Sequence, residues 1–90
     1  MGADTLALAH WVVQSLPTTI PAPELSAEPD GQITLEWYRS PTRLLSVSID
    51  PVGSLHYAAT LGGRAQYGTE PFLGDFPLAL SALAYQVMCL

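Results

Sequence analysis

The chain of 90 residues contains no lysine, only three arginines and a single cysteine, Cys89. One cysteine excludes an intramolecular disulfide framework and is typical of a reducing compartment. Eight acidic residues give a formal net charge of −5. A negative chain without lysine lacks the positive surface that binds nucleic acids or anionic membranes, so neither is expected as a direct ligand. If the charge serves recognition as well as solubility, the partner presents a basic surface.

Long apolar runs and a secretion signal are also missing. Neither apolar stretch reaches the roughly 18–20 residues that span a bilayer. The N-terminal residues have no basic segment, and Asp4 and His10 interrupt their apolar run, so we predict no signal peptide and a cytoplasmic location. The length predicts a single domain, residues 1–90, and the hydrophobic fraction of 49% predicts that it folds.

Apolar residues at helical spacing predict a helix at each end of the chain. The first covers residues 5–16, with Asp4 or Thr5 as its N-cap and Pro17 ending it. Its predicted apolar face consists of Leu6, Ala9, Val13 and Leu16, widened by Leu8, Trp11 and Val12. Residues 17–31 contain four prolines and three acids, so we interpret them as a connecting arm that lies along the body without secondary structure.

The second helix covers residues 76–90, with Asp75 as its cap and Pro77 in its first turn. It has no charged side chain. One apolar stripe is predicted to pack on the sheet and consists of Leu80, Leu83, Ala84 and Val87. The apolar residues outside this stripe are Leu78, Ala82, Tyr85, Met88 and Leu90. They need a second cover, which is the N-terminal helix, a second copy of the chain or a partner protein.

Residues 32–70 show the period-two alternation of an antiparallel meander with three or four strands. The loop between the first two strands sets Trp37 opposite Leu45 and Leu35 opposite Val47, which gives them a common buried face. For the last hairpin, a three-residue loop would pair Tyr57 with Tyr67 and keep both on that face, and we favour this register. The predicted fold is therefore α+β, with the C-terminal helix across one sheet face.

No motif in the sequence supports catalysis or metal binding. His10, His56 and Cys89 are scattered without ligand spacing, and the glycines form no phosphate-binding motif. His56 is expected to be a solvated residue opposite Ser48. We therefore predict a non-enzymatic protein with no catalytic residue, no metal and no cofactor.

The sheet face away from the helices is the remaining candidate site. It carries small hydroxyls, which are also usual on a solvated face, and the exposed aromatic Tyr38. The candidate partner-binding residues are Glu24, Glu28, Asp30, Glu36, Tyr38 and Asp50. Tyr38 would be the aromatic anchor and the acids would contact lysines and arginines. Arg39 and Arg43 are expected to border this patch.

The run DGQITLEWYRSPTRLLSVSIDPVGSLHYA, residues 30–58, resembles a pattern found in small bacterial and phage proteins. The chain as a whole resembles phage-borne anti-CRISPR proteins, including inhibitors of type I effectors, in its size, acidity and mixed helix and sheet. This resemblance implies a non-enzymatic inhibitor that occupies a basic, nucleic-acid-binding surface of an effector. The alternative is a structural or assembly subunit that associates through its apolar C-terminal helix, as a homodimer or with a neighbour.

Overall fold

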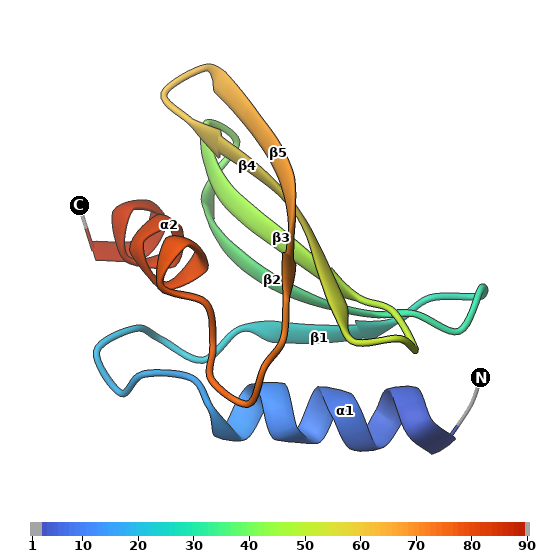
Figure 1. Ribbon diagram of the computed structural model, residues 1–90. Helices are drawn as coiled ribbons and strands as arrows, with labels where there is room; N and C mark the ends of the chain where they lie inside the picture. Colours follow the sequence, from blue (N-terminus) through green and yellow to red (C-terminus); the bar gives the residue numbers. More distant parts are fainter. Residues whose placement is uncertain (1–2, 90) are drawn as a thin grey trace.

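The computed structural model describes the backbone of residues 3–89 and the side chains of residues 7–89. Its elements are α1 (Ala3–Gln14), β1 (Glu24–Ala27), β2 (Ile33–Ser40), β3 (Arg43–Ile49), β4 (Ser54–Leu61), β5 (Arg64–Pro71) and α2 (Leu78–Cys89). The strands form one antiparallel sheet in chain order (Figure 1). The α+β class is confirmed, and the sheet has five strands where three or four were predicted. Neither described helix is long and apolar enough to cross a membrane.

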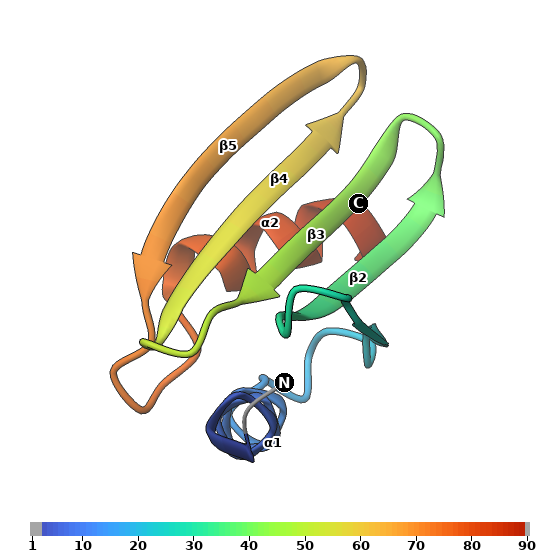
Figure 2. The same ribbon diagram turned by 90° about the vertical axis from the view of Figure 1, so that its right-hand side faces the viewer.

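The core lies beneath one face of the twisted sheet. In Figure 2, α2 lies behind the sheet and α1 lies at its lower end. The predicted stripe of α2 is buried, together with Ala9 and Val12 of α1. The buried side chains of the sheet are Ile33, Leu35, Trp37, Leu45, Val47, Ile49, Leu55 and Ala59. We call the sheet face that carries them the inner face.

Strands β2, β3 and β4 pair as the alternation predicts. Trp37 lies opposite Leu45 and Leu35 opposite Val47, so this register is confirmed. Trp37 is fully buried, its ring lies 6.0 Å from that of Phe76, and its Nε1 donates to the Pro21 carbonyl at 2.8 Å. This side chain therefore connects the sheet with the segments that precede both β1 and α2.

The predicted register between β4 and β5 is wrong. Leu61 pairs with Arg64 across a two-residue turn, and Tyr57 lies opposite Gly68 instead of Tyr67. Both turn residues, Gly62 and Gly63, have positive φ of 60° and 88°, which suits the tight hairpins that match strand twist. Tyr67 consequently faces away from the core and is 76% exposed.

The interpretation of residues 17–31 as an arm without secondary structure is also wrong. Glu24–Ala27 forms β1, which pairs with β2 from Glu24 opposite Glu36 to Ala27 opposite Ile33. The buried side chain of Ile20 and the bond from Trp37 to Pro21 hold the preceding segment on the body. Pairing there satisfies backbone groups of β2 that would otherwise lie at a free edge.

Both helices differ from prediction at their ends. α1 begins at Ala3, so Asp4 and Thr5 lie within its first turn, and the side chain of Leu6 lies outside the described set. Trp11 does not widen the buried face, since it is 66% exposed. α2 begins at Leu78, and the Pro77 carbonyl accepts its first bond from Ser81 N–H at 3.0 Å. Asp75 lies three residues before Leu78 and is not at the cap position.

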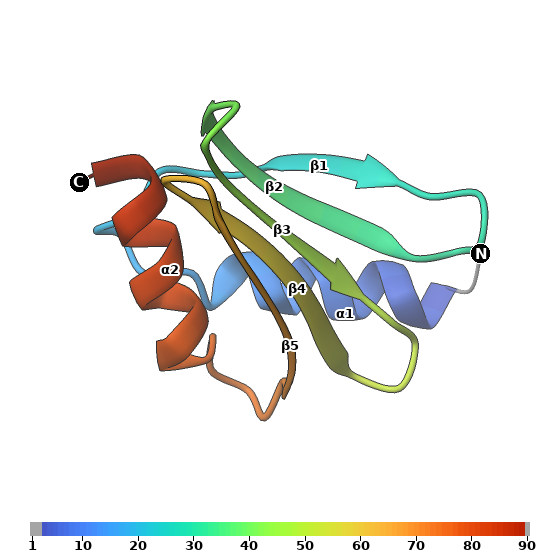
Figure 3. The ribbon, with the colours of Figure 1, turned by 90° about the horizontal axis from the view of Figure 1, so that it is seen from above.

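The outer side of α2 is not covered by α1. Leu78 is 87% exposed and Tyr85 is 44% exposed, while Ala82 and Cys89 are also exposed. Figure 3 shows α2 at one end of the molecule, with α1 passing beneath the sheet. The predicted cover by the N-terminal helix is therefore wrong for these residues. Leu90 lies outside the described residues.

Candidate functional site

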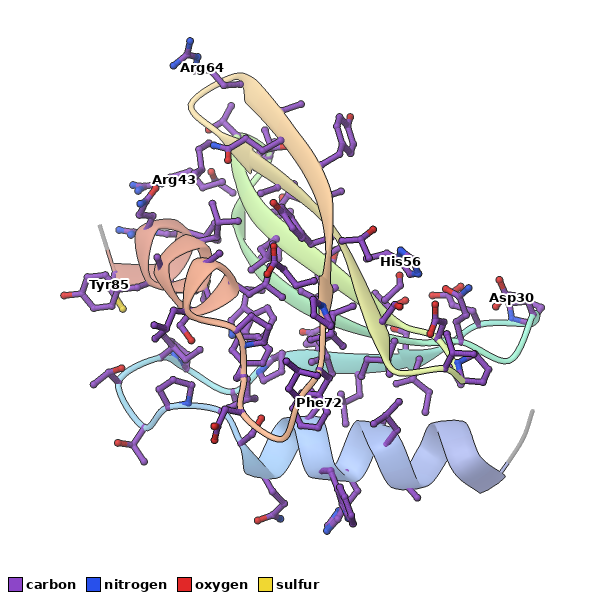
Figure 4. The ribbon with its side chains drawn as sticks, viewed as in Figure 1. Asp30, Arg43, His56, Arg64, Phe72 and Tyr85 are labelled. Atoms are coloured by element: carbon purple, nitrogen blue, oxygen red, sulfur yellow. The ribbon has the colours of Figure 1, made fainter. Side chains whose placement is uncertain are left out.

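Four of the predicted binding residues lie along one edge of the sheet, in β1, β2 and the turn between them, and we call Glu24, Glu28, Asp30 and Glu36 the acidic edge. Glu24 lies in β1, Glu36 lies in β2, and Glu28 and Asp30 lie in the connection between these strands. Glu36 is half-buried and the other three are exposed. In Figure 4, Asp30 lies at the right-hand end of the molecule and Tyr85 at the left-hand end.

Glu24 and Glu36 are direct cross-strand partners. Residues opposite each other in an antiparallel pair direct their side chains to the same face, with Cα atoms about 4.5–5.5 Å apart. Like charges in this position destabilise a sheet. The pair lies on the face away from the core, which we call the outer face, and it concentrates negative charge there.

The turn between β1 and β2 holds the other two acids in place. The Glu28 N–H donates to the Gln32 carbonyl at 2.8 Å, and the Gly31 N–H donates to the Glu28 carbonyl at 3.0 Å. One carboxylate oxygen of Asp30 accepts the Gln32 N–H at 3.0 Å. Asp30 is thus oriented by its own turn while its side chain remains exposed.

Tyr38 shares the outer face with Glu36 and is 55% exposed. It lies two residues further along β2, about 7 Å from Glu36 at the usual rise of a strand. An exposed aromatic ring beside carboxylates suits a partner that presents arginine or lysine next to apolar surface. The structure therefore brings Tyr38 close to the acidic edge.

Asp50 directly follows Ile49, which lies opposite Ile33 at the start of β2 next to the β1–β2 turn, and its carboxylate is already engaged. One oxygen accepts the N–H groups of Val52 and Ser54, both at 3.0 Å. The other lies 2.7 Å from Nε2 of His56. The Asp50 side chain is only 16% exposed. It therefore organises the β3–β4 turn and contributes little free charge to a binding surface.

The pKa of the Asp50 carboxyl is held below its ordinary value. Partial burial acts to raise this pKa, but the Ser54 N–H, the His56 ring and the Val52 N–H favour the ionised form and outweigh burial. Because a carboxylate only accepts hydrogen bonds, the His56 ring donates from Nε2 to Asp50. Its Nδ1 lies 3.0 Å from the Thr69 hydroxyl oxygen.

His56 lies opposite Ser48 as predicted, but it is more than a solvated residue. Through Asp50 and Thr69 it connects the β3–β4 turn with β5. The order of acid, imidazole and hydroxyl is that of a nucleophilic triad. The ring is 46% exposed, however, so water competes for these bonds, and we assign the three residues a structural role.

The two arginines that flank the β2–β3 turn do not border the acidic residues as predicted. Arg39 donates to the Met88 carbonyl at 3.3 Å, and Arg43 donates to the Gln86 carbonyl. These carbonyls belong to the last turn of α2, where a positive charge is favourable. Figure 4 shows Arg43 beside α2. The positive charges of Arg39 and Arg43 are therefore engaged by α2.

Within the described residues, no cluster of three or more histidine, cysteine, aspartate or glutamate side chains is arranged to hold a metal ion. Comparison with family models, curated proteins and solved structures gives no match. Function is therefore inferred from the geometry of this chain.

Sequence reasoning missed Thr69 and the role of the two arginines. Thr69 could be found only with the correct β4–β5 register, which sets it opposite His56. The paired turn glycines were the available signal, since adjacent glycines favour a two-residue hairpin loop. The arginine contacts depend on the position of the C-terminal turn of α2, for which no sequence signal exists.

Proposed function

We propose that this chain is a non-enzymatic inhibitor whose acidic edge binds a basic, nucleic-acid-binding surface of a partner protein. One observation carries the proposal: four acids lie along one sheet edge, including the directly opposed Glu24 and Glu36, while Arg39 and Arg43 are bound to α2. Such a separation of charge steers association with a basic surface and excludes nucleic acid from it. The resemblance to anti-CRISPR proteins makes a type I CRISPR effector the first partner to test.

The test measures capture of a purified type I effector complex by the immobilised chain, with elution in a salt gradient. We expect retention that decreases with salt, and competition with the nucleic acid that the effector binds. Glu24→Lys and Glu36→Lys should each weaken retention, because they reverse charge within the acidic edge. Asp75→Lys is the matched control, since it makes the same change in the exposed loop before α2. Equal retention of all variants would refute the charge-driven mechanism.

A second function is favoured by the exposed outer side of α2. Leu78, Ala82, Tyr85 and Cys89 follow each other at spacings of four and three, which forms one stripe along the helix. A structural subunit could pair through this stripe. Light scattering distinguishes the two functions: a dimer that Tyr85→Glu converts to a monomer supports assembly, while a monomer at high concentration counts against self-association.

A further inference from the structure

The free edge of β1 carries unpaired backbone groups. β1 lies at one border of the sheet and its four residues are exposed (Figure 3). The Glu28 N–H bonds to the Gln32 carbonyl. Bonded and non-bonded pairs alternate along an antiparallel ladder, so Leu25 and Ala27 direct their N–H and C=O groups away from β2. Pro23 and Pro29 have no N–H, so the donors of this edge are confined to β1.

An apolar groove lies beside this edge. Its volume is about 380 Å³, and its lining residues are Ala9, His10, Val13, Leu25, Ala27 and Ile33. Leu25 is 59% exposed although it points to the inner face. A residue added opposite Leu25 or Ala27 would point to the same side, because directly opposed residues of antiparallel strands share a face. Its side chain would enter the groove.

The other side of the same edge is acidic. Glu24 and Ser26 alternate with Leu25 and Ala27, so they face the outer side together with Glu36. Every second residue of an added strand would lie beside these carboxylates. The two sides of the edge therefore have different preferences: an apolar side chain in the groove and a positive one next to Glu24 and Glu36.

We propose that β1 binds an extended segment of the partner as a sixth, antiparallel strand with alternating apolar and basic residues. This inference rests on the proposed function and specifies the segment recognised. Backbone bonds to Leu25 and Ala27 provide affinity, and the groove and the acidic edge provide specificity. A second copy of this chain does not fit, because pairing two β1 edges would bring two acidic edges together.

The probe is a fluorescent, acetylated hexapeptide of alternating arginine and valine, with binding measured by fluorescence anisotropy. In the proposed pairing the valines lie opposite Leu25 and Ala27, so the valine N–H groups donate to β1 and the arginine N–H groups do not. N-methylation of the valines should therefore abolish binding, whereas N-methylation of the arginines should preserve it. Equal binding of the two methylated peptides to the wild-type chain would overturn the proposal.

Two proline variants test the same contact from the protein. Ala27→Pro removes an N–H that faces the free edge and leaves the β1–β2 bonds intact. Ala65→Pro is the matched control on the opposite edge strand: since the Phe72 N–H bonds to the Gly53 carbonyl, the same alternation directs the Ala65 N–H outward. Ala27→Pro should weaken binding about tenfold, the effect of roughly one or two backbone hydrogen bonds. Ala65→Pro should leave binding unchanged.

The outcomes separate this inference from the proposed function. Salt-sensitive binding that Glu24→Lys abolishes, with no difference between Ala27→Pro and Ala65→Pro, overturns strand addition and leaves charge-driven binding in place. Binding of the effector that none of the charge variants changes overturns both. Should Ala27→Pro lose its fold by circular dichroism, the methylated peptides decide the question, because they leave the protein unaltered.

Discussion

Trp37 connects three segments that are distant in the sequence. It is fully buried in β2, donates to the Pro21 carbonyl and contacts Phe76 before α2. Its neighbour Tyr38 points to the outer face and is 55% exposed. Two adjacent aromatic residues thus have opposite roles, one in the core and one at the candidate site.

Trp37→Phe should lower the free energy of unfolding by about 2 kcal/mol, because it removes buried volume and leaves the Pro21 carbonyl without its donor. Urea denaturation measures this change. Tyr38→Phe is the matched control, since it alters an exposed aromatic by one hydroxyl and should change stability by less than about 0.5 kcal/mol. Equal losses in the two variants would contradict the assigned role of Trp37.

Asp50→Asn should make stability less sensitive to acid. A carboxyl whose pKa is lowered in the folded state stabilises the fold above its unfolded pKa, and this contribution is lost as pH falls through the folded pKa. Asparagine keeps an oxygen that accepts the Val52 and Ser54 N–H groups but has no charge to lose. Urea denaturation at pH 6 and at about pH 3, below the usual aspartate pKa of about 3.9, should therefore show a smaller decrease for the variant. Parallel decreases would refute the assignment.

The hairpin of β4 and β5 depends on one close approach. A Cβ added at Gly68 would lie 2.6 Å from the hydroxyl oxygen of Tyr57, and nearly as close to its ring carbons. Tyr57 therefore packs across the position that Gly68 leaves open. The observed register accommodates the Tyr57 ring because it sets a residue without a side chain, Gly68, opposite Tyr57.

Gly68→Ala should lower the free energy of unfolding by about 1–2 kcal/mol, because the Tyr57 ring must move out of contact. In a Tyr57→Ala background the same substitution should be neutral or slightly stabilising, since the space is then free and glycine no longer adds backbone entropy to the unfolded state. A double-mutant cycle followed by urea denaturation measures this coupling. Additive effects would mean that the ring does not occupy this space.

The assembled fold separates its charges. Asp30 of the acidic edge lies at the end opposite Tyr85, and Arg39 and Arg43 contact the last turn of α2 (Figure 4). Directly opposed glutamates cost stability, so their placement favours a role in binding over a role in folding.

Glu36→Gln should therefore raise stability while it weakens partner binding. Removing one of two opposed charges should increase the free energy of unfolding by roughly 0.2–1 kcal/mol, and high salt should reduce this gain. Thermal denaturation at low and high salt checks the first effect, and effector capture checks the second. A loss of stability would show that Glu36 supports the fold instead.

Several features of the fold and site followed from local sequence pattern. The period-two alternation placed Trp37 opposite Leu45, and helical spacing identified the buried stripe of α2. Composition identified the acids, and alternation placed Glu36 and Tyr38 on the outer face. These inferences succeeded because side-chain period and short turns are local properties of the chain.

Other features were decided by contacts between distant segments. β1 forms because Ile20 and the Trp37–Pro21 bond hold the arm beside β2. The alternation of residues 24–27 covers only four residues between prolines, which is too short to indicate a strand by itself. The β4–β5 register was set by the conformation of Gly62 and Gly63 and by the fit of Tyr57 over Gly68, against a simple count of apolar residues. The sequence by itself determined which residues are acidic and which face of the meander is buried. Only tertiary packing decided that Glu24 would lie opposite Glu36 and that Asp50 would be used in a turn, because those positions depend on pairing across the sheet.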